Sequence, residues 1–486
     1  MSLKQSAVSG IKWSLASQLG RQIMQLLTTV VLARFLSPND FGLVSMATIT
    51  TGFMTLFSDL GTSAAIIQRK QVSDSLVSTL FWVNGIFGIL ASFILIVCAP
   101  LVTYFYQEPR VTELLRVLAL TFIISGFSIA HKAILEKKLD FKTLAKIENA
   151  AVFLGAILGI VSAFTGFGVW SLVIQTLTVA AITSILLWST SQWKPQFIFC
   201  FSDLKEVSSF TLNLTGFTIF NYFVRNSDYI LIGRFLSSQD LGYYTLAYRI
   251  LVYPIQGISA VVGRVMFPIL SKIQDDNAKF RSIYLKAITR ISLITFPLMT
   301  GVFVLSEPLI LAFFGPQWRP VIILVMILSP LGLIQSVAMT VGYIYNIKDR
   351  TDLLFGWGIA TGFPAIIAFG IGLHWGIIGV ATAYNIYYLC LVTYPCFAIP
   401  FRLIELPMGD LGLVLWRPWF TSLIMLIVIS ALKFILPTSL ASIWILVILV
   451  PLGILSYLLA SWWINRQELL GFINFITPCS KEQLID

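Results

Sequence analysis

Apolar residues run through this chain in long stretches separated by short polar connections. Each stretch approaches or exceeds the roughly 20 residues that a helix needs to cross a bilayer. The stretches are continuously apolar rather than alternating with a period of two, which favours helices over the strands of a barrel. The pattern predicts an all-α polytopic membrane protein with about fourteen membrane-spanning helices. The predicted spans are 11–36, 41–67, 78–106, 113–134, 147–165, 168–189, 207–236, 241–271, 283–305, 320–345, 353–373, 375–400, 415–436 and 441–463.

The composition agrees with this pattern and excludes a soluble protein. Of 486 residues, 57% are hydrophobic and 11% are charged, and the mean hydropathy is +0.89. Soluble domains carry about 25% charged residues. The net charge of +10 is therefore no sign of nucleic-acid binding, because most Lys and Arg residues lie on one alternating set of connections. This bias predicts cytoplasmic N- and C-termini, with the basic loops facing anionic headgroups.

The first apolar stretch is not a cleavable signal peptide. It is too long for one, it contains Lys12 and Arg21, and it lacks a small-residue cleavage site.

An internal repeat is the most specific feature of the chain. Residues 34–42 read RFLSPNDFG and residues 234–242 read RFLSSQDLG, with six of nine positions identical at an offset of 200. Six spans precede the second copy, so both copies enter the membrane in the same orientation, as in parallel-repeat transporters. The repeat predicts two pseudo-symmetric halves around a central cavity. The expected divisions are 1–200 with spans 1–6, 201–400 with spans 7–12, two additional spans in 401–464, and a cytoplasmic tail in 465–486.

Polar residues form a stripe on the first span that recurs on the seventh. Spacings of three and four place such residues on one helical face. The first stripe contains Gln18, Arg21, Gln22, Gln25 and Thr29, and the second contains Thr218, Asn221, Tyr222, Arg225 and Tyr229, each 200 residues later. The second and eighth spans carry comparable polar faces. We expect these four spans to line the cavity, which is open to water.

Several charges on these helices are expected at membrane depth, where they are costly unless they face a cavity or a partner. Four Arg residues against two Asp residues favour an anionic ligand, because guanidinium groups bind phosphate oxygens in pairs. The candidate substrate-binding residues are Arg21, Gln22, Gln25, Asn221, Arg225, Arg249 and Arg264, and the ion-coupling candidates are Asp228 and Asp59.

The alternative is that these charges pair internally and only fix helix packing. Arg225 and Asp228, three residues apart, are spaced for this. Asp40 and Asp240, beside the repeated turns, are expected to stabilise the turns or cap the next helix.

No sequence signal indicates catalysis, a metal or a cofactor. His131 and His374 are far apart, the five cysteines show no CxxC spacing, and there is no phosphate-binding loop of the GxxxxGK[ST] type. No connection is long enough to hold a catalytic domain. We expect a protein that is not an enzyme.

Taken together, the residues resemble a known family. The repeated RFLS turn, residues 221–234 with Asn221-Tyr222 and Asp228-Tyr229-Ile-Leu-Ile-Gly-Arg, and Phe314-Gly-Pro-Gln-Trp318 are similar to the polysaccharide transporter branch (Wzx-type flippases) of the MOP superfamily. Within it, the chain is most similar to flippases of colanic-acid and teichuronic-acid export.

The resemblance implies a MATE/MOP-like fold and the transfer of undecaprenyl-pyrophosphate-linked oligosaccharides across the bacterial plasma membrane. The cationic cavity would take the pyrophosphate, and the prenyl tail would stay in lipid. Coupling to H⁺ or Na⁺ and contact with polysaccharide assembly machinery are further expectations.

Two other functions remain open. The first is an ion-coupled multidrug exporter of the related MATE branch, which would favour cavity acids over the Arg excess seen here. The second is a membrane enzyme such as a polysaccharide polymerase, for which the longest outer connection, about 306–319, offers only Glu307 and Arg319.

Overall fold

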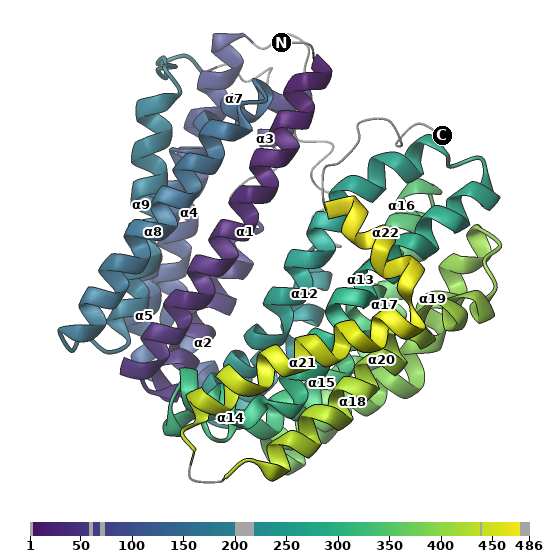
Figure 1. Ribbon diagram of the computed structural model, residues 1–486. Coiled ribbons are helices and arrows are strands. Elements are labelled where there is room, and N and C mark those ends of the chain that lie inside the picture. Colours follow the sequence, from purple (N-terminus) through teal and green to yellow (C-terminus); the bar gives the residue numbers. More distant parts are fainter. Residues whose placement is uncertain (1–2, 58–61, 69–72, 200–217, 438–439, 477–486) are drawn as a thin grey trace. The chain divides into compact units, whose positions relative to one another are not determined.

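The computed structural model describes residues 3–57, 62–68, 73–199, 218–437 and 440–476, and within them every regular element is a helix (Figure 1). The chain folds into two compact units, Met1–Thr245 and Leu246–Asp486, and helix α12 passes from the first into the second. The expected all-α class is confirmed. The proposed division into sequence halves at residue 200 stays a prediction.

The first unit is built from long helices and shorter, broken ones. Their bounds are α1 (Leu3–Phe35), α2 (Pro38–Thr55), α3 (Thr62–Gln68), α4 (Asp74–Tyr106), α5 (Arg110–Leu118), α6 (Leu120–Gly126), α7 (Ile129–Lys137), α8 (Phe141–Phe164), α9 (Trp170–Thr190), α11 (Ser227–Phe235) and the start of α12 (Ser238–Lys272).

Helix α8 lies between α1 and α9 and packs closely on both (Figure 1). The approach to α9 depends on Gly155 and Gly159, because a side chain at Gly155 would collide with Val179 and one at Gly159 would press on Gln175. Small residues at this spacing let two helices approach closely in a membrane. On the other side, the rings of Phe35 and Phe164 are 4.2 Å apart, so the C-terminal end of α1 meets the C-terminal end of α8. Nearer the start of both helices, Asn149 of α8 contacts Ser17 of α1, so the two helices run parallel.

In the described residues, the second unit continues after α12 with ten α-helices and three short helical turns. Their bounds are α13 (Asn277–Val304), α14 (Ser306–Phe313), α15 (Val321–Ala338), α16 (Val341–Ile347), α17 (Thr351–Gly372), α18 (Gly376–Tyr387), a π-helical turn (Tyr388–Val392), α19 (Thr393–Leu403), α20 (Met408–Ile435), α21 (Ser442–Ile464) and α22 (Arg466–Ile476), with short 3-10 turns at Pro316–Trp318 and Leu373–Trp375.

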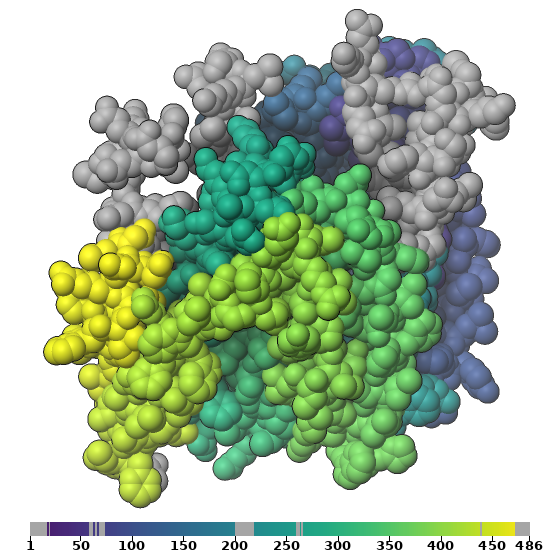
Figure 2. Space-filling model, turned by 90° about the vertical axis from the view of Figure 1, so that its right-hand side faces the viewer, coloured from purple at the N-terminus to yellow at the C-terminus, as the bar shows by residue number. Residues whose placement is uncertain are grey.

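The core of this unit joins α13, α20 and α21, while its outer surface stays apolar. Buried Leu293, Ile429 and Leu449, one from each helix, belong to one hydrophobic cluster. Figure 2 shows a face covered largely by the green-to-yellow part of the chain, and apolar side chains of α20 and α21 such as Trp419 and Leu455 are exposed. Apolar residues on both the inside and the outside of a helix bundle are typical of a membrane protein.

Helices occur at all fourteen predicted spans in the part of the chain that is described. Eight described helices are long and apolar enough to cross a membrane, or nine if a bent pair counts as one span. One of the eight, Thr351–Leu403, covers two predicted spans, because the chain reverses at Gly376 with a φ of 67°. The predicted spans that fail this test are 11–36, 41–67, 207–236 and 241–271, the ones with polar faces. The protein is therefore a multi-pass membrane protein.

Some predicted spans are broken rather than continuous in the described part of the chain. The span predicted at 113–134 consists of α5, α6 and α7, with a bend of 43° between Arg110–Gly126 and Ile129–Lys137. The span predicted at 41–67 consists of α2 and α3. Hydropathy alone did not reveal these breaks, since the flanking residues are as apolar as a helix interior.

Candidate functional site: a polar cluster at membrane depth

The polar stripe of the first span lies on α1, well inside the membrane. Arg21 is 14 residues from Phe35, which corresponds to about 21 Å along the helix. Its side chain retains 29% of its exposure. Gln22 is half-buried and Gln25 is exposed. Since the apolar core of a bilayer is about 30 Å thick, Arg21 lies in the third of the membrane away from Phe35.

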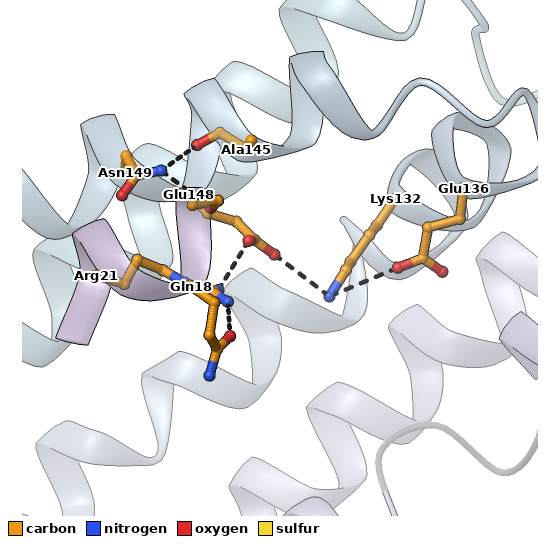
Figure 3. Close-up of polar contacts among 8 residues, drawn as sticks. Gln18, Arg21, Lys132, Glu136, Ala145, Glu148 and Asn149 are labelled. Carbon is orange, nitrogen blue, oxygen red and sulfur yellow. Dashed lines mark hydrogen bonds and ion pairs between the residues drawn. The ribbon is translucent and has the colours of Figure 1, made fainter. Parts of the chain in front are cut away.

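Arg21 is paired with an acidic residue on α8 that the sequence analysis did not single out. Its Nη1 lies 2.7 Å from Oε2 of Glu148, and its Nη2 donates a 2.8 Å hydrogen bond to Oε1 of Gln18 (Figure 3). The other oxygen of Glu148 is 3.9 Å from Nζ of Lys132 on α7, which is also 3.9 Å from Glu136. We call these four charged residues, Arg21, Lys132, Glu136 and Glu148, the charge cluster.

A neighbouring hydrogen bond joins the same two helices without using the charges. Nδ2 of Asn149 donates to Oγ of Ser17 at 2.9 Å and to the carbonyl of Ala145 at 2.7 Å. The Asn149 side chain also touches the helix surface at Gly20, where an added Cβ would lie 3.1 Å from its Oδ1. The polar contact of Asn149 with Ser17 therefore fixes α8 on α1 beside the charge cluster.

The seventh span is helical at 218–225 and again from Ser227, with a break at Asn226. Asn221 is half-buried and Arg225 is exposed, and Tyr222 donates a 2.6 Å hydrogen bond to the carbonyl of Ile49 on α2. Tyr222 of the seventh-span stripe thus contacts α2, and whether the two polar faces line a cavity stays a prediction. No contact of the described residues joins Arg21 to Asn221 or Arg225.

Asp228 is buried at the start of α11 and is 5% exposed. Its carboxylate accepts hydrogen bonds from the hydroxyl of Tyr244 at 3.0 Å and from its neighbour Tyr229 N–H at 2.9 Å. Both carboxylate oxygens of Asp228 thus have a hydrogen-bond donor. Arg225 is exposed whereas Asp228 is buried, so the two side chains do not form the internal pair that their spacing allows.

The remaining candidates belong to the second unit or lie outside the described residues. Arg249 is half-buried in the second unit. Arg264 belongs to α12, but its side chain lies outside the described part, and so does Asp59 altogether. Arg290, near the middle of α13, is a half-buried cation at membrane depth that the sequence analysis missed.

The two copies of the repeat form the same local structure. In the first, the hydroxyl of Ser37 donates to Asp40 at 2.7 Å and accepts from the Asp40 N–H at 3.2 Å. In the second, Ser237 and Asp240 make the same two contacts at 2.7 and 3.0 Å. Such reciprocal bonds cap the first turn of a helix. The capping role expected for Asp40 and Asp240 is confirmed.

The repeated turns also contact each other. A Cβ at Gly42 would overlap the carbonyl oxygen of Ser238, and a Cβ at Gly242 would overlap the carbonyl oxygen of Pro38. One turn further, Oγ1 of Thr245 lies 3.1 Å from Oγ of Ser45, its equivalent at the offset of 200. Equivalent residues touch one another beside a two-fold axis, so the two copies of the repeated turn are related by a local pseudo-two-fold axis. We call this contact of α2 with the start of α12 the glycine crossing.

A single signal in the sequence points to the missed partner of Arg21. Glu148 is the one acidic residue in the predicted span 147–165, and an ionised group in such a place needs a partner. The predicted span begins only at residue 147, whereas α8 begins at Phe141, so the predicted boundary placed Glu148 at the end of the span instead of one turn or more inside the helix.

Comparison with known proteins gives a family match over most of the chain. A family model described as "Polysaccharide biosynthesis protein" matches residues 31–323. The teichuronic acid biosynthesis protein TuaB of Bacillus subtilis is 32% identical over 73% of this chain and 74% of its own length. The lipopolysaccharide biosynthesis protein WzxC of Escherichia coli is 28% identical over 91% of this chain and 90% of its own.

Solved structures match the fold. The lipid II flippase MurJ in an inward closed conformation has a TM-score of 0.75, with 18% identity, and covers 93% of this chain and 99% of its own. An inward-facing multidrug MATE transporter of the MOP superfamily has a TM-score of 0.59, with 17% identity, over 88% of this chain and 100% of its own. The expected MATE/MOP-like fold is confirmed.

Proposed function

Because this chain belongs to the polysaccharide biosynthesis protein family, in its polysaccharide transporter branch, we propose that it is a flippase for lipid-linked oligosaccharides. It transfers undecaprenyl-pyrophosphate-linked units across the bacterial plasma membrane for surface polysaccharide synthesis, and it works by alternating access. Relatives named for teichuronic acid and lipopolysaccharide biosynthesis support this substrate class.

The observation that carries the proposal is the position of Arg21. Its guanidinium is partly exposed and lies in the third of the membrane away from the Phe35 end of α1. With the N-terminus in the cytoplasm, as the distribution of Lys and Arg favours, this is the side where a lipid-linked diphosphate resides before transfer. A guanidinium fork matches two phosphate oxygens and keeps its charge there.

The orientation and the location follow the same reasoning. Basic side chains outnumber acidic ones around the start of α13, where residues 272–286 contain four Lys or Arg residues and two Asp residues. This basic excess supports cytoplasmic N- and C-termini in a bacterial plasma membrane. Anionic membrane lipids would contact the basic end.

The coupling ion, H⁺ or Na⁺, is assigned to Asp228, with Asp59 as second candidate. The support is the burial of Asp228, because an ionisable group inside a membrane protein marks an ion path by default. Contact with polysaccharide assembly machinery is also part of the proposal, as is the absence of enzymatic activity. A drug exporter shares the fold but not the family match, so it ranks second.

The test is complementation of a strain lacking this gene. We expect Arg21→Ala and Arg225→Ala each to lower surface polysaccharide by about tenfold or more at matched protein level, because each removes a phosphate contact of about 1.5–3 kcal/mol. Arg402→Ala, at an exposed end of α19, is the matched control and should export normally. Asp228→Asn, measured in the same assay, tests the proposed ion-coupling residue. Normal export by both Arg21→Ala and Arg225→Ala would remove the proposed phosphate site.

A further inference from the structure

The charge cluster has no net charge in the structure. Arg21 and Lys132 contribute two positive charges, and Glu136 and Glu148 contribute two negative ones. Helix α9, the other neighbour of α8, contains no titratable side chain. The guanidinium that is proposed to bind a phosphate is therefore already bound to a carboxylate. Both groups offer anionic oxygens that accept hydrogen bonds from an Arg side chain.

The pair is accessible and is not needed to hold the helices together. The side chains of Arg21 and Glu148 keep 29% and 25% of their exposure, so a ligand can reach the guanidinium. Asn149 links α8 to α1 through Ser17, independently of Glu148. The Glu148 side chain has flexible torsions, whereas the backbone on both sides of it is fixed.

A second cation is already in place for Glu148. Its Oε1 lies 3.9 Å from Nζ of Lys132, on the side away from Arg21 (Figure 3). A small rotation that lengthens the contact with Arg21 therefore shortens the contact with Lys132. The carboxylate can leave the guanidinium without losing a cationic partner, which lowers the cost of the exchange.

We propose that Glu148 is an internal competitor for the ligand's diphosphate. With no ligand bound, its carboxylate holds the Arg21 fork in position. When a prenyl diphosphate binds, phosphate oxygens replace the carboxylate on Arg21, and Glu148 turns to Lys132. The reverse exchange helps to expel the diphosphate after transfer. This inference rests on the proposed function and assigns a positioning residue to the same site.

The test measures binding of farnesyl pyrophosphate, a short prenyl diphosphate, to the purified full-length protein in lipid nanodiscs by titration calorimetry. Glu148→Gln should bind the probe about five- to tenfold more tightly than wild type, because the competing charge is gone. Arg21→Ala should bind it about tenfold more weakly. Glu113→Gln, which removes an exposed acid of α5 outside the charge cluster, is the matched control and should stay within about twofold.

Two further measurements separate competition from a structural role. In the double variant Arg21→Ala/Glu148→Gln, the tightening should disappear, because there is no guanidinium left to release. In cells, Glu148→Gln should export less polysaccharide despite its tighter binding, since release is slowed. If Glu148→Gln fails to fold, Glu148→Asp, with a shorter reach to Arg21, should still tighten binding.

Equal or weaker binding by a folded Glu148→Gln, with Arg21→Ala still weaker than wild type, would overturn the competitor role and leave the proposed function standing. Probe binding that is absent in wild type, together with normal export by Arg21→Ala, would instead remove the proposed function and the inference with it.

Discussion

At the scale of single residues, two glycines decide how closely α2 and α12 approach. Gly42 and Gly242 lie at equivalent positions of the repeat. At each of them, a Cβ atom would overlap the backbone of the other copy. Neither has a positive φ, so backbone conformation does not require glycine there. The requirement is one of space, and it applies equally on both sides of the pseudo-two-fold axis.

We expect Gly42→Ala and Gly242→Ala each to lower the free energy of unfolding by about 1–3 kcal/mol, because a methyl group must push the two helices apart. The midpoint of thermal unfolding in detergent reports the change. Gly356→Ala in α17, where nothing lies within 4 Å of an added Cβ, is the control. It should be neutral or slightly stabilising, since alanine favours a helix. Equal effects at all three positions would argue against the close approach.

At the scale of elements, the connection between α4 and α5 is tied to the start of α12. Arg110 binds both carboxylate oxygens of Glu108, at 2.9 and 3.0 Å, and the hydroxyl of Ser238 donates to the same carboxylate at 3.4 Å. The hydrogen bonds from Arg110 hold the pKa of Glu108 below its ordinary value. This connection lies outside the membrane-spanning helices, so bulk pH reaches it.

A lowered pKa in the folded state means that ionised Glu108 stabilises the fold above its ordinary pKa of about 4.3. The stabilisation is lost as the pH falls through the lowered pKa. We expect Glu108→Gln to lower the free energy of unfolding at pH 7 by less than about 1 kcal/mol, because Arg110 keeps 54% of its exposure and water screens the pair. The midpoint of thermal unfolding should fall accordingly. The difference should shrink as the pH is lowered from 7 to 3, because the carboxyl group becomes protonated.

Asp352→Asn provides the comparison for this prediction. Arg350 binds Asp352 with the same two-pronged geometry, at 2.9 Å to each oxygen, but both residues are exposed and belong to one chain segment. Its effect should be smaller, because the pair joins no second element. An effect of Glu108→Gln that is the same at pH 7 and pH 3 would contradict the role of its charge.

Elements were more predictable from the sequence than contacts between them. A helix occurs at each predicted span because apolar length alone is enough to require one in a membrane. The breaks at Asn226 and between α6 and α7 were not predicted, since they depend on side-chain hydrogen bonds and packing rather than on hydropathy. Arg21 was predicted at depth, but its partner is 127 residues away on α8, a contact that no local spacing encodes.

At the scale of the whole molecule, the repeat links sequence to the proposed cycle. The matching turns at 34–42 and 234–242 predicted pseudo-symmetry, and the glycine crossing places equivalent residues in direct contact. The central cavity stays a prediction. Alternating access requires some contacts to break in each cycle. The glycine crossing lies near the Phe35 end of α1, which is the outer end in the proposed orientation, and it joins α2 to the start of α12.

A cross-link between Ser45 and Thr245 tests whether this contact opens during transport. Their hydroxyl oxygens are 3.1 Å apart, so cysteines at both positions lie within reach of a disulfide. The five native cysteines are first replaced. In this background we expect oxidised Ser45→Cys/Thr245→Cys to export at least about tenfold less polysaccharide, because thermal motion cannot break the disulfide and the contact stays closed. A tenfold loss corresponds to about 1.4 kcal/mol of added barrier. Reduction should restore export, and each single variant should be active throughout. Full export by the cross-linked protein would mean that α2 and α12 stay together while the substrate crosses, and transfer would then have to proceed through a path that leaves the glycine crossing closed.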